Sequence, residues 1–145
     1  MKHFVLLLVL LLSGCGDTHP AYSPPDPESV TVVTAQLYGD GGEDEIIKNF
    51  EIPGSHTDEL LALLAGATID RFPSKWQLLG EIDIGYTGGL TQIQLFRTYD
   101  SVGAFRANGV YYRGGSDSAF ISQIKAARKT RSEQDDAGKP DPAAS

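Results

Sequence analysis

Cysteine and histidine are scarce in this 145-residue chain, which contains one cysteine and three histidines. A single cysteine cannot form a disulfide within the chain, so the fold must be stabilised by an apolar core. Catalytic zinc sites normally use two or three histidine or cysteine ligands. Only His56 lies in the part of the chain that is patterned like a folded domain, because His3 and His19 lie near the N-terminus. The sequence therefore argues against a zinc enzyme, and we expect no cofactor.

Basic residues and long apolar runs are also few. Twelve lysines and arginines stand against nineteen aspartates and glutamates, which gives a formal net charge of −7. Nucleic-acid phosphates require a basic surface, so we expect no nucleic-acid partner. The longest apolar run, from Phe4 to Leu12, is shorter than the roughly 20 helical residues needed to cross a bilayer. The sequence therefore predicts a domain that does not span a membrane.

The first 15 residues have the layout of a secretory signal. A basic start at Met1-Lys2-His3 precedes the apolar run, and the small residues Ser13 and Gly14 follow it. This order of charged, apolar and small residues is typical of a signal peptide that is removed during export. We therefore expect residues 1–14 to be absent from the mature protein.

The four residues Leu12-Ser13-Gly14-Cys15 resemble the lipobox of bacterial lipoproteins. The resemblance implies that the sulfur of Cys15 receives a diacylglyceryl group and that a peptidase cuts before Cys15. Each buried methylene of such chains contributes about 0.8 kcal/mol, so two or three chains give lasting attachment to the bilayer. The resemblance also implies an extracytoplasmic domain in the cell envelope. Asp17 lies one position later than the aspartate that retains family members at the inner membrane, so the choice of membrane stays open.

Composition divides the rest of the chain into three segments. Residues 15–29 hold the lipidated cysteine and four prolines, and this stretch predicts an extended tether without helix or sheet. Residues 130–145 have no apolar side chain larger than alanine and are expected to be disordered. Residues 30–129 are expected to form a single domain with one core.

Periodicity predicts three strand pairs and two helices in this domain. The expected strands are Val30–Tyr38, Ile46–Ile52, Gln77–Tyr86, Leu90–Tyr99, Ala104–Ala107 and Val110–Arg113. Asn108-Gly109 is a strong tight-turn signal. One helix should follow a cap at Ser55, or alternatively at Thr57, and end at Gly66, and the other should begin at Ser116. Because hairpins outnumber crossovers, we expect an α+β fold, a mostly antiparallel sheet with both helices on one face in a two-layer sandwich.

The turn Arg113-Gly114-Gly115-Ser116 is the main candidate for ligand binding. A strand ends at Arg113, two glycines can expose backbone amides, and a helix begins at Ser116. Amides, a helix N-terminus and an arginine together favour a phosphate or carboxylate. The alternative is a structural turn in which Arg113 pairs with a nearby carboxylate, and Asp117 in the first helical turn supports that alternative.

Three polar clusters have a chemical and a structural interpretation. The acidic loop Asp40–Glu45 could bind calcium but lacks the spacing of a dedicated calcium loop, and a solvated hairpin tip is the alternative. The run Ser55–Asp58 contains a serine, a histidine and an aspartate, the residue types of a hydrolase triad. Adjacent residues point in different directions and cannot converge as a triad requires, so a structural role at the helix start is the alternative. Glu81 and Asp83 share a strand face and could serve a glycosidase only within a cleft.

The aromatic residues also allow two interpretations, a binding surface for sugar or peptide or ordinary packing against the sheet. The residues concerned are Trp76, Tyr86, Phe96, Tyr99, Tyr111 and Tyr112.

The sequence supports three functional hypotheses. The leading one is an envelope lipoprotein, anchored in the bilayer by acylated Cys15, whose non-enzymatic domain binds a protein partner. The second is a small-anion or ligand-binding lipoprotein that uses the Arg113 turn, and the third is a small hydrolase with an unrecognised site.

Overall fold

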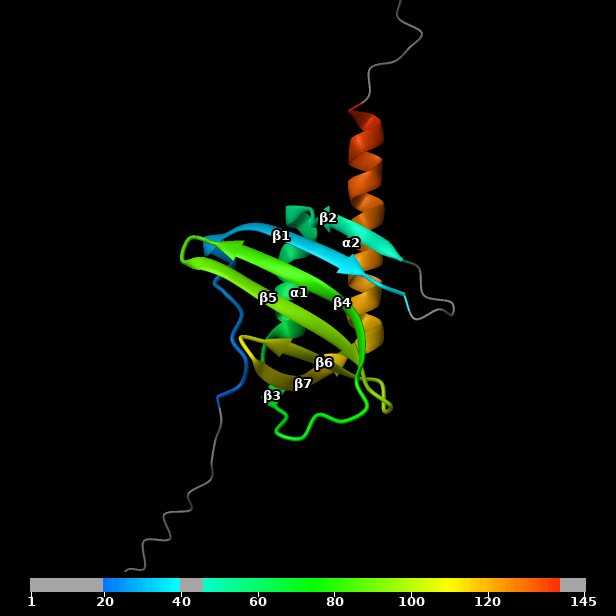
Figure 1. The fold of residues 1–145 in the computed structure, drawn as a ribbon. Helices are drawn as coiled ribbons and strands as arrows, with labels where there is room; N and C mark the ends of the chain where they lie inside the picture. The colour runs from blue at the N-terminus through cyan, green and yellow to red at the C-terminus, as the bar shows by residue number, and fades with distance from the viewer. Residues whose placement is uncertain (1–19, 40–45, 139–145) are drawn as a thin grey trace, which may run out of the picture.

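The computed structural model describes residues 20–39 and 46–138, which form seven strands and two helices in sequence order (Figure 1). The elements are a 3-10 turn η1 (Pro27–Ser29), strands β1 (Val30–Leu37) and β2 (Ile47–Glu51), helix α1 (Gly54–Leu64), strands β3 (Thr68–Ile69), β4 (Gln77–Tyr86), β5 (Gly89–Arg97), β6 (Val102–Ala107) and β7 (Val110–Ser116), and helix α2 (Asp117–Ala137).

All strands belong to one sheet in the order β2-β1-β4-β5-β6-β7-β3, and every pairing is antiparallel. The three expected strand pairs are the hairpins β1–β2, β4–β5 and β6–β7. Asn108 and Gly109 join β6 to β7 with φ angles of 50° and 81°, the left-handed backbone that a two-residue turn needs. Both helices lie on the same face of the sheet (Figure 1). The expected α+β sandwich is confirmed.

The core lies between the helices and one face of the sheet. Alternate residues of the strands point into it, because successive side chains of a strand point to opposite faces. The strand residues with essentially no exposed surface include Ile82, Ile84, Ile93, Leu95 and Phe105. Helix α1 contributes Leu60, Leu61 and Leu64, and α2 contributes Phe120, Ile124 and Ala127. The domain thus has the single apolar core that its composition predicts.

The structure differs from the predicted tether at Tyr22, which belongs to the core. Its amide donates a hydrogen bond of 2.7 Å to the carbonyl oxygen of Ala67, and its own carbonyl accepts one of 2.9 Å from Gly66. The Tyr22 ring packs edge-on against Phe105 and Tyr112, with both centroid distances at 5.0 Å. Burial of one large ring offsets the entropy of ordering a proline-rich segment. Residues 22–29 are therefore part of the domain.

The structure also differs at the C-terminal end, where α2 continues through Thr130 to Ala137. The first turns of α2 are packed in the core, and extending an existing helix costs much less than nucleating one. Two ion pairs support the extension, and each joins side chains one helical turn apart: Lys129–Glu133 at 4.0 Å and Arg131–Asp135 at 3.3 Å. The expected disorder is thus not found up to Ala137, and residues 139–145 lie outside the described residues. Across the described ranges, no helix combines the length and apolar character needed to cross a membrane.

Helix caps account for a third difference. Helix α1 begins at Gly54 with Pro53 in the cap position, so both Ser55 and Thr57 lie inside the helix and the predicted caps are wrong. Ser116 does hold the cap position of α2, but its hydroxyl contacts the Ser118 hydroxyl at 2.7 Å and makes no capping hydrogen bond. A proline before the first turn serves α1 because its fixed φ suits a helix entry.

Candidate functional site

The sheet face opposite the helices, called here the uncovered face, carries polar, charged and aromatic side chains. Phe105 contacts Phe120 of α2 and therefore points to the helices, so its neighbour Arg106 points away. The same alternation and the strand register place a row of further side chains on the uncovered face, among them Gln36, Tyr38, Glu81, Asp83, Leu90, Gln92, Gln94, Phe96 and Tyr111. Together with Arg106 they come from five adjacent strands, β1, β4, β5, β6 and β7, and form one continuous surface.

Three half-buried aromatic rings form a cluster on this face. Trp76 lies 5.6 Å from Phe96 and 5.4 Å from Tyr111 between ring centroids, and Phe96 lies 6.1 Å from Tyr111. The guanidinium of Arg106 lies 5.5 Å from the Tyr111 ring centroid, within the range of a cation–π contact. The aromatic residues thus divide between internal packing and a surface that could bind a partner. Tyr112 is packed inside the domain with Tyr22, whereas this aromatic cluster borders solvent.

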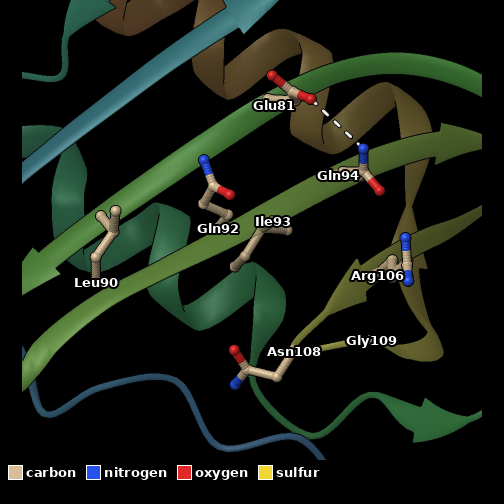
Figure 2. A pocket seen from close by; sticks show the side chains of 8 residues that line it. All are labelled: Glu81, Leu90, Gln92, Ile93, Gln94, Arg106, Asn108 and Gly109. Carbon is tan, nitrogen blue, oxygen red and sulfur yellow. Dashed lines mark hydrogen bonds between the residues drawn. The ribbon is translucent and has the colours of Figure 1, made fainter.

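A polar hollow of about 410 Å³ lies on this face (Figure 2). The hollow adjoins the aromatic cluster through Arg106, which lines the hollow and contacts the Tyr111 ring. It is lined by Glu81, Leu90, Gln92, Ile93, Gln94, Arg106, Asn108 and Gly109. The hollow follows from the strand pairing. β5 pairs with β6 only from Ile93 to Phe96, so its residues from Gly89 to Gln92 continue past the end of β6. This leaves a gap between β5 and the Asn108 turn, which the side chains of Gln92 and Arg106 border.

Glu81 at one side of the hollow is held in a hydrogen-bond network. Gln36 donates to its carboxylate at 2.8 Å and Gln94 at 3.5 Å. A hydrogen bond from the Tyr38 hydroxyl, aided by these amides, lowers the pKa of Glu81. Burial, and then the hydrogen bond to Glu81, raise the pKa of Tyr38 to about 12. Glu81 is therefore ionised at neutral pH, whereas a general acid of a glycosidase needs a raised pKa.

Arg113, the arginine of the predicted anion site, contacts two carboxylates. Its Nε lies 2.9 Å from Asp70 and its Nη1 lies 3.0 Å from Asp100. The hydrogen bond that Arg113 donates to Asp100 raises the pKa of Arg113, and hydrogen bonds from Thr98 and then Arg113 lower the pKa of Asp100. One cation beside two anions does not attract a third anion. This geometry matches the structural alternative, and anion binding here stays an untested prediction.

The glycines of the same turn have packing roles. A Cβ atom at Gly114 would lie 2.8 Å from the Cβ of Ala67, so only glycine lets β7 approach this residue. Gly115 has a φ of +72°, which glycine adopts without strain. Asp117, the first residue of α2, is buried and lies 3.5 Å from Arg97. The positive end of the helix is thus already matched by a carboxylate.

The remaining candidates are His56, the acidic loop and Cys15. Both ring nitrogens of His56 are engaged, Nε2 with Thr130 at 2.9 Å and Nδ1 with Gln123 at 3.2 Å, so the histidine joins α1 to α2. The acidic loop from Asp40 to Glu45 lies outside the described residues, as does Cys15. Among residues 20–39 and 46–138, no group of three histidine, cysteine or acidic side chains could hold a metal ion.

No protein-family model, curated protein or solved structure matches this chain. Its function must therefore be inferred from its own residues, of which Cys15 and the uncovered face are the most informative. Sequence reasoning missed Gln92, Arg106 and Asn108 as neighbours around a hollow. The alternation of Gln92 and Gln94 along β5 was a signal for an uncovered polar face, but the gap beside it depends on where the pairing of β5 and β6 ends.

Proposed function

We propose that this protein is a lipoprotein of the bacterial cell envelope, anchored by acylated Cys15, whose domain binds a protein partner through the uncovered face. The observation that carries the proposal is the placement of the aromatic cluster directly beside the polar hollow on the one sheet face without helices. The anchor rests on the lipobox resemblance of Leu12-Ser13-Gly14-Cys15.

The composition of the uncovered face supports a protein partner. Aromatic residues and arginine are enriched where proteins bind one another, because they bury a large area at low entropic cost. Here three rings and Arg106 lie together. Leu90 and Tyr38 on the same face are 60% and 39% exposed, which adds apolar surface at the edge. A partner that covers this face would remove these apolar atoms from water.

The polar side chains of the hollow suit peptide groups better than catalysis. The amides of Gln92, Gln94 and Asn108 each offer donors and an acceptor, and a peptide backbone presents the same two kinds of group. Arg106 adds a donor for a carbonyl or carboxylate of the partner. Glu81 is already occupied by Gln36 and Gln94, so its carboxylate holds the amide side chains in place.

Photo-crosslinking in intact cells tests the partner. A benzophenone amino acid at Gln92 should give a discrete covalent adduct, whereas the same amino acid at Ala126, which is exposed on α2, should not. Adding Arg106→Glu, a charge reversal at an exposed side chain, should remove the Gln92 adduct without lowering the melting temperature. Equal adducts from both positions, or an adduct that survives Arg106→Glu, would show that the uncovered face is not the binding surface.

Cys15→Ser tests the anchor separately. The variant should lose the mass of the acyl chains and move from the membrane to the soluble fraction. A protein that stays on the membrane with an unchanged mass would exclude acylation of Cys15.

A further inference from the structure

Two aromatic side chains at one end of the molecule are almost fully exposed. Phe72, in the loop between β3 and β4, is 86% exposed, and Tyr99, in the loop between β5 and β6, is 80% exposed. They are the two most exposed large hydrophobic side chains among the described residues. Both line an open hollow of about 500 Å³ together with Trp76 and Arg113. Phe72, Tyr99 and these loops are called the aromatic rim.

The chain enters the domain at the same end. The described chain begins at Pro20. The dark blue segment that starts it lies at the lower end of the molecule in Figure 1, where the loop between β3 and β4 also lies. Hydrogen bonds tie Tyr22 to Gly66 and Ala67, and Ala67 directly precedes β3. The entry point is thus fixed to the strand that leads into the Phe72 loop.

The entry point is also close to the anchor in sequence. Pro20 follows Cys15 by only five positions. A fully extended chain gains at most about 3.6 Å per residue, so the acylated cysteine lies within roughly 18 Å of Pro20. This span is less than half of the reach that a tether ending at Ser29 would have. The domain cannot move far from the membrane that holds Cys15.

We propose that the aromatic rim rests on the bilayer surface, with Phe72 and Tyr99 in the interfacial region of the lipid. This inference depends on the acylation of Cys15 in the proposed function. Aromatic side chains favour the interface because it accepts both their apolar rings and their polar edges. The occupant is a bilayer because the anchor places lipid within reach of these loops.

The charges of the domain agree with this orientation. The Phe72 loop carries the exposed basic residue Lys75, which suits lipid phosphates. Asp70 of the same loop contacts Arg113. The acidic side chains at the end of α2 lie at the opposite end of the molecule (Figure 1) and would face away from anionic lipid.

A single fluorescent label tests the orientation. Cys15 is the only native cysteine and its sulfur is acylated in the proposal, so Ser74→Cys provides one free thiol in the Phe72 loop. The full lipidated protein carries an environment-sensitive nitrobenzoxadiazole label and is reconstituted into vesicles of phosphatidylethanolamine and phosphatidylglycerol. Label at position 74 should brighten and shift to the blue on reconstitution. Label at Glu133→Cys, an exposed position on α2, should not change.

A matched variant assigns the signal to the rim. Phe72→Ser together with Tyr99→Ser should reduce the blue shift at position 74, while flotation of the protein with the vesicles persists through Cys15. Flotation with an unchanged spectrum at position 74 would overturn the orientation and leave the anchor intact. Loss of flotation in the parent protein would disprove the acylation of Cys15 and, with it, the orientation proposed here.

Discussion

The ring of Tyr22 meets the ring of Phe105 edge-on, with centroids 5.0 Å apart, although the two residues are far apart in sequence. Tyr22 comes from a proline-rich segment before the first strand, and Phe105 is a fully buried residue of β6. The contact fixes the start of the folded domain close to Cys15. Tyr22 therefore contributes to the stability of the fold and also sets how few residues separate Cys15 from the folded domain.

Tyr22→Ala should lower the free energy of unfolding by about 3–5 kcal/mol, the cost of removing a large buried ring. Tyr99→Ala is the matched control, because Tyr99 is 80% exposed and Tyr22 is 9% exposed. The control should change stability by less than about 0.5 kcal/mol. Urea denaturation of the Cys15→Ser protein, followed by the fluorescence of its single tryptophan, measures both. Equal effects from the two variants would contradict the placement of Tyr22 in the core.

Alkaline pH should destabilise the domain through the same residue. Burial, and then the neighbouring Tyr112 and Tyr86, raise the pKa of Tyr22 to about 12, from 10.0. The unfolded chain therefore loses this proton first as the pH rises. The contribution of Tyr22 to stability should be constant below about pH 10 and should fall by roughly 2–3 kcal/mol as the pH rises to about 12.

Denaturation at a series of pH values across this alkaline range gives the test. Tyr22→Phe, which keeps the ring but has no ionisable proton, should flatten this fall without removing it, because Tyr38 also has a raised pKa. An identical pH profile for the variant would show that Tyr22 is not buried in the folded state.

Gly114→Ala should destabilise the domain because the new methyl group would lie 2.8 Å from the Cβ of Ala67. Displacing Ala67 would also disturb its hydrogen bond with Tyr22, so a loss of about 1–3 kcal/mol is expected. Gly54→Ala is the control. A methyl group at position 54 would meet no atom within 4 Å, and alanine favours the first turn of α1.

Thermal melting of both glycine variants gives the comparison. Gly114→Ala should melt at a lower temperature than the parent, and Gly54→Ala at the same or a higher temperature. A neutral Gly114→Ala would remove the packing explanation for this glycine and would favour renewed tests of the Arg113 turn with phosphate.

The sequence by itself determined the hairpins, both helices and the fold class. Strict alternation in β4 and β5, the Asn108-Gly109 turn and the leucine stripe of α1 are local signals, and each depends on residues within one element. The lipobox resemblance at Cys15 is equally local. Such features could be predicted because near neighbours in the chain specify them.

Only the tertiary structure decided where the domain begins and which surface is left open. Tyr22 is ordered by Phe105 and Ala67, which are distant in sequence, so composition alone suggested a tether. The two-residue strand β3 exists because Arg113 and Tyr112 of β7 pair with it. The hollow beside Gln92 arises where β5 extends beyond its pairing with β6. The register between two strands depends on residues far apart in sequence, so the local pattern of side chains does not predict it.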